Sequence, residues 1–250
     1  MYQDVSELQQ FYASPMGQMV RRLIVPRIRS RWRDTRGLTV MGLGYALPFL
    51  ASFRAEAQRL GALMPAQQGG VRWPADGPCR SVMVEDDLLP LPDLSVDRLL
   101  CVHAVETSGA VRPMLREIWR VLRPEGRLMV IVPNRRGLWA RRDNSPFGHG
   151  QPYSRSQIEA LLVGAMFGIE DTSYALVAPP IDWRPLWNSA PSLERRGMAL
   201  PSFAGVIMVE ARKEVSGTIP RGHRATVLKR SRRALLAPTP SRRESQSRSD

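Results

Sequence analysis

The sequence predicts an α/β fold in which helices cover both faces of a mostly parallel sheet. Short apolar runs at residues 81–84, 97–102 and 127–132 lack the polar alternation of half-exposed strands, so they are typical of strands buried on both faces. An amphipathic helical pattern at 110–122 lies between two of these runs, and such alternation of strand and helix builds parallel sheets. The run at 127–132 is the strongest strand candidate and ends at Pro133.

Helix and strand patterns also fill the N-terminal quarter of the chain. Residues 5–33 carry apolar side chains at helical spacing, and we expect Pro15 and Pro26 to divide this stretch into shorter helices. A short apolar run at 37–44 ends in glycines and predicts a strand followed by a turn. Helical spacing resumes over 49–60, so the predicted order is strand, glycine turn and helix.

The remaining elements are shorter. An apolar run at 60–64 stops at a proline, and the Gln-, Gly- and Pro-rich stretch 66–78 is predicted to be loop. A capping box, S-x-x-Q at 154–157, begins a further helix. The last two strands are predicted at 173–178 and 204–211.

Composition and charge divide the chain into three parts. Hydrophobic residues at 43% and charged residues at 24% are typical of a globular protein. The formal net charge is +13, but residues 211–250 alone hold eleven basic and three acidic residues, so a nucleic-acid binder with a basic core is not implied. We therefore expect a helical segment at 1–36, an α/β domain at 37–213 and a basic, disordered tail at 214–250.

The basic regions leave several roles open. The tail could bind RNA or an anionic membrane, but it holds no aromatic residue for base stacking, and a solubilising tail is the commoner explanation. Arginines between Arg21 and Arg36 give the N-terminal helical segment a basic face. That face could contact a membrane surface or RNA, or be a solvated face of a helix that covers the core.

Cysteine and histidine spacing argue against a disulfide scaffold or a metal site. Cys79 and Cys101 form no C-x-x-C motif, and the three histidines are scattered along the chain. The longest uncharged run, 37–53, is too short and too rich in glycine and proline to span a membrane. Acidic residues precede any apolar stretch at the N-terminus, so we expect no secretory signal and a cytoplasmic protein.

The segment from Glu85 to Pro133 resembles the class I S-adenosylmethionine-dependent methyltransferases of the type 11 group. Leu-Pro-Leu-Pro-Asp at 89–93 is similar to the "LPFPD" turn of that family, and 103–106 partly matches its "hxlEH" stretch. The stretch 117–126 fits "EixRvLkPGG" at most positions. The resemblance implies a Rossmann-like fold with a seven-stranded sheet, S-adenosylmethionine as cofactor, and methyl transfer to an acceptor.

The glycine-rich first motif departs from the family pattern. The family has an acid followed by G-x-G-x-G after the first strand; here Gly42 stands in the acid's place and Gly44 in that of the first glycine. Ala46 and Pro48 replace the other two glycines, and no carboxylate stands near Met64, where the family's ribose-binding acid is expected. Each lost carboxylate–hydroxyl bond is worth roughly 1.5–3 kcal/mol.

The resemblance still implies a variant cofactor site at the ends of the strands. Glu85 stands where the family places an acid near the adenine, and Tyr45 could compensate by stacking or hydrogen bonding. The residues expected to bind S-adenosylmethionine are Gly42, Gly44, Tyr45, Ala46, Glu85, Asp86 and Val102.

Acceptor chemistry is expected beyond the same strand ends. His103 is the candidate general base, although a histidine bonded to backbone at a strand end is an equal alternative. Glu106 could orient a substrate or cap the next helix. The loop after the strongest strand is dense in Arg, aromatic, Gly and His residues, and we expect it to bind the acceptor through Asn134, Arg135, His149 and Tyr153.

Three functions follow from these observations. The first is an S-adenosylmethionine-dependent methyltransferase that acts on a small-molecule acceptor. The second, motivated by the altered glycine motif, is a methyltransferase-like binding protein without activity, whose basic face or tail contacts RNA, a membrane or a protein. The third is a nucleic-acid methyltransferase anchored by its tail.

Overall fold

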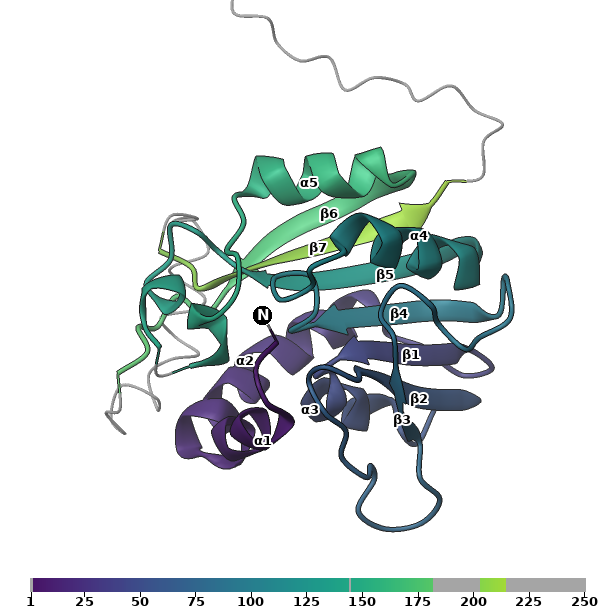
Figure 1. Cartoon of the computed structure of the whole chain (residues 1–250), viewed down its shortest axis with the longest axis horizontal. Coiled ribbons are helices and arrows are strands. Elements are labelled where there is room, and N and C mark those ends of the chain that lie inside the picture. The colour runs from purple at the N-terminus through teal and green to yellow at the C-terminus, as the bar shows by residue number, and fades with distance from the viewer. Residues whose placement is uncertain (1, 144, 182–202, 215–250) are drawn as a thin grey trace, which may run out of the picture. The chain divides into compact units, whose positions relative to one another are not determined.

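A seven-stranded sheet organises the protein. We analysed a computed structural model, which describes residues 2–143, 145–181 and 203–214. The strands run in the order β3-β2-β1-β4-β5-β7-β6 (Figure 1). Pairs from β3 through β5 are parallel, and β7 pairs antiparallel with both β5 and β6. The predicted α/β fold with a mostly parallel sheet and seven strands is confirmed.

The elements alternate along the chain as the sequence predicts. The strands are β1 (Thr39–Gly44), β2 (Arg59–Pro65), β3 (Ser81–Val84), β4 (Val96–Val102), β5 (Leu122–Pro133), β6 (Phe167–Ala175) and β7 (Val206–Lys213). The helices are α1 (Val5–Ala13), α2 (Pro15–Arg31), α3 (Leu47–Leu50), α4 (Val111–Val121) and α5 (Arg155–Gly164).

Two hydrophobic cores form, one on each face of the sheet. Neighbouring residues of β4 show the division, because Leu100 belongs to the core with α1, α2 and α3, whereas Leu99 and Cys101 belong to the core with α4 and α5. The same two groups of helices lie on opposite sides of the sheet in Figure 1. Strands buried on both faces explain why the central apolar runs have no polar alternation.

The N-terminal helical segment forms two helices, because only one of the two predicted breaks occurs. Ser14 ends α1 and caps α2 by accepting a hydrogen bond from the backbone N–H of Gly17, and Pro15 takes the first helical position. Pro26, expected to break the helix, lies inside α2. Burial of Ile24 and its neighbours on either side of this proline holds the helix together despite the lost hydrogen bond.

The helix expected over 49–60 is wrong in its second half. Only α3 and a single 3-10 turn, Ala51–Phe53, are helical, and Arg59 already begins β2. Phe49 and Phe53 reach the core from these two turns, so the apolar spacing that suggested a long helix is satisfied early. Leu60 instead pairs with Val40 of β1.

Two other strand predictions need correction. β3 is an edge strand whose Val82 and Met83 are exposed, so its apolar run does not mean burial on both faces. β6 spans 167–175 and not 173–178, because it follows α5 after a short turn at Met166. The tail from 215 and most of the loop predicted between the last strands lie outside the described residues.

The capping box at the start of α5 is confirmed, with Ser154 and Gln157 each bonding the other's backbone. Across the described part of the chain, none of the helices has both the length and the apolar character needed to span a membrane.

Candidate functional site

The strand order reverses between β1 and β4. From β1 the chain passes to β2 on one side, whereas β4 and β5 are added on the other. In open α/β sheets, ligands bind in the crevice beyond the carboxyl ends of the strands at such a switch point. The relevant ends are therefore Gly44 of β1 and Val102 of β4, which face each other in register.

A tight turn joins β1 to α3 and packs directly against the end of β4. Gly44 adopts φ +79°, and a Cβ there would lie 2.2 Å from the carbonyl oxygen of Val102. The backbone N–H of Tyr45 donates to that same carbonyl at 2.9 Å. Glycine is thus required here both by the left-handed conformation and by the close approach of β4. Ala46 follows, fully buried.

Gly42 explains why the first motif lacks its acid. A Cβ at this position would lie 2.6 Å from the Leu50 side chain and 2.7 Å from the Cβ of Ala46. A carboxylate therefore has no room unless α3 moves. The packing of α3 onto β1 takes the place of a polar anchor.

His103 lies at the end of β4, 2% exposed and with φ +53°. Its Nε2 is 2.8 Å from the hydroxyl of Tyr12 and its Nδ1 is 3.2 Å from Oε1 of Glu106. A carboxylate can only accept a hydrogen bond, so the neutral imidazole carries its proton on Nδ1 and donates a hydrogen bond to Glu106. Nε2 then accepts a hydrogen bond from the hydroxyl of Tyr12. Both ring nitrogens thus bond to side chains, in contrast to the backbone-bonded alternative.

Glu106 is only half satisfied. Its side chain is 1% exposed, and Oε2 has no hydrogen-bond partner in the described structure. The predicted acceptor loop packs against its backbone, because Gln151 donates to the Glu106 carbonyl at 2.7 Å and a Cβ on Gly150 would lie 2.4 Å from that oxygen. An unpaired buried acceptor costs about 1–3 kcal/mol, so a group that donates to Oε2 would stabilise this arrangement.

Tyr12 of α1 is the residue that sequence reasoning missed. Its ring stacks on Tyr45 with centroids 5.6 Å apart and planes 22° apart, and it meets the edge of Phe49 at 5.7 Å. Burial raises the pKa of Tyr45 to about 12 and that of Tyr12 well above its ordinary value, so both are phenols at neutral pH. No motif marks Tyr12, because nothing local shows that α1 reaches strand ends about 90 residues away in sequence.

The ends of β2 and β3 add two further polar groups. Gln68, 1% exposed, donates from Nε2 to the His103 carbonyl at 3.3 Å, while its Oε1 has no partner in the described structure. Asp86 is buried and accepts from the hydroxyls of Tyr2 and Ser108. Of the two predicted acids, Glu85 is exposed and Asp86 is turned inward. Gln68 lies just past the position where the family's ribose-binding acid was expected.

The predicted acceptor-side residues gather only in part. Asn134 and Tyr153 form a parallel bridge, and the backbone N–H of Arg135 donates to the Tyr153 carbonyl at 2.9 Å. Tyr153 also reaches the carbonyl of Val105 at 3.5 Å, beside Glu106. His149 lies on the loop and contacts the carbonyl of Asp143 at 3.3 Å, while Arg135 is exposed.

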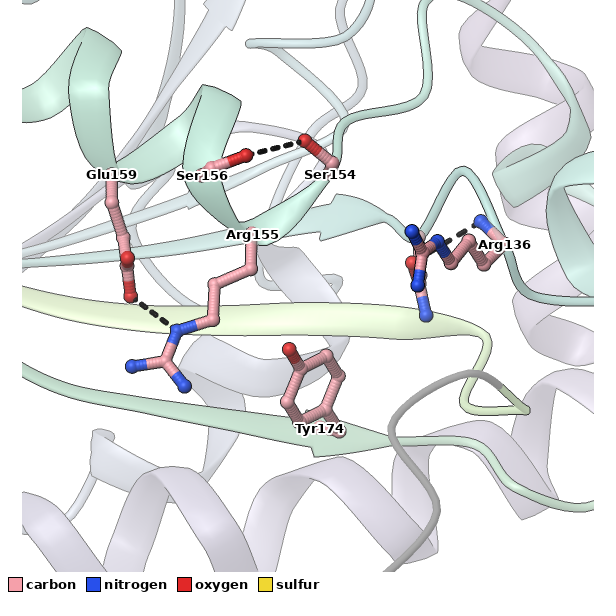
Figure 2. Close-up of a pocket in the computed structure, with 7 residues that line it drawn as sticks. Arg136, Ser154, Arg155, Ser156, Glu159 and Tyr174 are labelled. Carbon is pink, nitrogen blue, oxygen red and sulfur yellow. Dashed lines mark hydrogen bonds and ion pairs between the residues drawn. The ribbon is translucent and has the colours of Figure 1, made fainter. Parts of the chain in front are cut away.

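A separate cavity of about 290 Å³ lies between β5, β6 and the start of α5 (Figure 2). Arg155 donates to Glu159 at 2.7 Å, and Figure 2 shows the Tyr174 ring next to this pair. The lining residues are Asn134, Arg136, Ser154, Arg155, Ser156, Glu159 and Tyr174. This cavity is open and cationic, and of the predicted site residues it includes only Asn134.

Comparisons with known proteins agree with this fold. Residues 30–130 match the family model described as a methyltransferase domain. A probable S-adenosylmethionine-dependent methyltransferase of Mycolicibacterium smegmatis is 37% identical over 86 residues, which is 34% of this chain and 33% of that protein. The chain thus matches about a third of the length of this curated relative.

Solved structures with the same fold cover more of the chain. The putative methyltransferase in complex with the Haloferax volcanii Trm112 methyltransferase activator superposes with a TM-score of 0.60 at 19% identity, covering 84% of this chain and 97% of that one. An S-adenosylmethionine-dependent methyltransferase from Mesorhizobium loti gives 0.56 at 16% identity, covering 75% and 96%. At such identities these likenesses establish the fold.

The family's cofactor fits the polar groups of this site but not its packing. Gln68 Oε1 and Glu106 Oε2 are buried acceptors without partners in the described structure. The hydroxyl and amino groups of the cofactor could donate hydrogen bonds to them. The Tyr12 ring, however, lies on Tyr45 at the switch point, where the crevice would open. S-adenosylmethionine therefore fits these residues only when Tyr12 moves away. The match over residues 30–130, together with the fold, supports a class I S-adenosylmethionine-dependent methyltransferase domain in this chain.

Proposed function

We propose that the protein is an S-adenosylmethionine-dependent methyltransferase in which His103 removes the proton of a hydroxyl acceptor. The single observation that carries this proposal is the orientation of His103 at the switch point. Its Nδ1 is held by Glu106, and its Nε2 already accepts a hydrogen bond from a phenol at 2.8 Å. An alcohol or phenol acceptor would present the same kind of hydroxyl to the same nitrogen.

Glu106 positions the base and stabilises its charged form. The carboxylate fixes the imidazole in the tautomer whose Nε2 can accept a proton, and it lies against the positive charge that forms when it does. Burial of both side chains strengthens this interaction. S-adenosylmethionine, when bound, supplies the methyl group, and the chain's own task is to orient the acceptor and take its proton.

The cofactor is proposed to bind through the turn after β1 and the polar side chains after β2 and β3. The predicted residues Gly44, Tyr45 and Ala46 supply the turn, while Asp86 and Gln68 offer carboxylate and amide groups. Val102 contributes backbone that the turn already contacts. Gly42 contributes by letting α3 pack closely, and the exposed Glu85 remains a candidate at the rim.

The acceptor is proposed to be a small molecule. His103 is almost completely enclosed, with the Phe147 ring 4.8 Å from the imidazole on the side of the acceptor loop. A large, structured acceptor could not reach such a base without removing this loop. Asn134, Arg135, His149 and Tyr153 belong to the same loop region, and we propose that they contact the acceptor.

The proposal is tested first by binding and then by transfer. Calorimetry with S-adenosylmethionine and S-adenosylhomocysteine should show saturable binding. Transfer of isotope-labelled methyl groups to a panel of hydroxyl-bearing small molecules should then fall about 10²- to 10⁴-fold in His103→Gln. Glu106→Gln should also slow transfer, because the carboxylate holds His103. Glu159→Gln, at a half-buried carboxylate on α5, is its matched control and should leave transfer unchanged.

Failure to bind either ligand at millimolar concentration would contradict the proposal. It would favour the alternative of a binding protein without activity, which the Tyr12 ring at the switch point would also suit. Transfer that is unaffected in His103→Gln would show that the acceptor needs no base from this pair. For the tail-anchored nucleic-acid enzyme, affinity for RNA must fall when residues 214–250 are removed.

A further inference from the structure

Residues 2–13 cross the carboxyl ends of four parallel strands. Tyr2 donates a hydrogen bond to Asp86, after β3. The backbone N–H of Val5 donates to the carbonyl of Gln68, after β2, at 2.9 Å. At its other end Tyr12 contacts the residues that follow β1 and β4. We call residues 2–13 the N-terminal strap.

Tyr12 fastens the strap at the switch point. Its hydroxyl bonds to the proposed base, and its ring stacks on Tyr45, the residue after Gly44. Next to it, the Phe11 ring meets the edge of Phe147 at 6.4 Å, so the strap also contacts the acceptor loop. The strap therefore lies over both halves of the proposed site.

A single non-helical residue, Ser14, joins the strap to α2. Ser14 has extended backbone between α1 and α2, and its side chain caps α2. Buried residues such as Val20 and Ile24 pack α2 into the core that also receives Leu8 and Tyr12 of α1. A rotation at Ser14 would lift α1 without unfolding α2.

The closed strap leaves unpaired polar atoms beneath it. Gln68 Oε1 and Glu106 Oε2 are both buried without partners in the described structure. The other polar atom of each side chain, Gln68 Nε2 or Glu106 Oε1, bonds to His103. Buried acceptors of this kind are mostly satisfied in native proteins, so we expect a ligand or water to donate to them. In the closed arrangement the aromatic rings are packed against one another, whereas two buried polar atoms lack hydrogen bonds.

We propose that the N-terminal strap closes the cofactor crevice of the ligand-free protein, with Tyr12 on His103 as its latch, and that cofactor and acceptor bind only after it opens. This inference rests on the proposed function. In the closed state the Tyr12 hydroxyl occupies the position of an acceptor hydroxyl. The strap therefore keeps the base covered until a ligand competes for the strand ends.

The closed state should reduce apparent cofactor affinity in proportion to its population. Removing the Tyr12 hydroxyl in Tyr12→Phe deletes one hydrogen bond and keeps the stacking on Tyr45. Its loss should lower the Kd for S-adenosylhomocysteine by about two- to tenfold. Tyr2→Phe breaks a different strap contact and should change the Kd in the same direction.

The experiment is calorimetry of the full chain and both variants with S-adenosylhomocysteine, together with hydrogen exchange. Tyr174→Phe, which lies in the other cavity, is the matched control and should leave the Kd unchanged. Thermal unfolding checks that each variant is folded. On ligand binding, the amides of α1 should exchange faster, while those of the turn at 44–46 should exchange more slowly.

Tighter binding by both strap variants, with faster exchange in α1, supports the strap. Unchanged or weaker binding by Tyr12→Phe and Tyr2→Phe, or slower exchange in α1 with ligand bound, overturns it while leaving the proposed methyltransferase in place. If the wild-type chain and all variants fail to bind, the proposed function falls and the strap falls with it. The two failures are therefore distinguishable.

Discussion

Two regions of the molecule, the switch point and the cavity beside α5, hold their polar side chains in opposite ways. At the switch point, His103, Glu106 and Gln68 are buried under aromatic rings, and two of their acceptor atoms are unpaired. At the cavity beside α5, Arg155 is exposed and already paired with Glu159 on its own helix. The first region is closed and polar inside, whereas the second is open and cationic.

This difference supports the proposal that the switch point is the ligand site. A buried unpaired acceptor costs about 1–3 kcal/mol. A ligand that donates hydrogen bonds to the two unpaired acceptors would remove this cost, which favours its binding. An exposed arginine paired within its helix has water and its neighbour already, and additional contacts change little. Burial and missing partners point to the first region.

The largest expected effect is a difference in unfolding free energy between a substitution in the strap and one in the sheet that it covers. Leu100 of β4 and Leu8 of α1 are both fully buried. Leu100→Ala should lower the free energy of unfolding by about 2–5 kcal/mol, because it leaves a cavity in the central strand. Leu8→Ala should lower it by less than half as much and mainly speed amide exchange in α1, because the strap opens on its own. Denaturant unfolding and hydrogen exchange measure both.

Equal losses in the two leucine variants, with unchanged exchange in α1, would show that α1 unfolds only with the whole domain. The N-terminal strap would then not open separately from the sheet.

The next effect concerns the turn at the switch point. Gly44 and Gly77 both have φ near +80°, but a Cβ at Gly77 would meet nothing within 4 Å. An alanine at either position costs about 1–2 kcal/mol for the left-handed backbone. Gly44→Ala must in addition push against the carbonyl of Val102, so we expect it to lose clearly more than Gly77→Ala in denaturant unfolding. Only Gly44→Ala should also weaken S-adenosylhomocysteine binding.

Similar losses of stability in both glycine variants would mean that the contact between the β1 turn and β4 yields easily. The proposed cofactor turn would then be less rigid than its hydrogen bond suggests.

The fold was largely predictable because its signals are local. Apolar runs buried on both faces identified β4 and β5, and the capping box placed the start of α5. The errors have local causes too. Phe49 and Phe53 satisfied the core within two turns, and an edge strand kept apolar residues such as Met83 although one side is exposed.

The site was predictable only where its residues stand at strand ends. His103 and the turn at 44–46 follow from the strand pattern and the resemblance, because carboxyl ends of parallel strands share one edge. Tyr12 and Gln68 could not be found this way. Tyr12 reaches His103 from 91 positions away through the docking of α1, and no spacing in the sequence encodes that contact.

A smaller effect tests the support beneath the closed region. Glu117 accepts from the backbone N–H of Leu89 at 2.9 Å, and Arg120 donates to the Leu89 carbonyl at 2.9 Å, so α4 holds the turn at 89–93 that follows Asp86. These are two of the motif segments that carried the family resemblance. Glu117→Gln should lower the free energy of unfolding by about 1 kcal/mol at pH 7.

The same pair predicts a pH dependence. Hydrogen bonds from Arg120 hold the pKa of Glu117 below its ordinary value. A group whose folded pKa is depressed stabilises the protein above its unfolded pKa, about 4.3 for a glutamate, and that contribution is lost as the pH falls through the folded value. The difference between wild type and Glu117→Gln should therefore shrink below about pH 4. A difference that grows on acidification would contradict this assignment.

The smallest effect is expected in the open cavity. Arg155 and Glu159 form an i,i+4 pair whose side chains are 56% and 25% exposed, and such pairs contribute about 0.3–0.5 kcal/mol. Arg155→Ala and Arg136→Ala should thus change the free energy of unfolding by less than about 0.5 kcal/mol and leave the Kd for S-adenosylhomocysteine unchanged. A tenfold loss of that affinity in either variant would place the cofactor on the cationic side of the sheet. The unpaired atoms of Gln68 and Glu106 would then need another ligand.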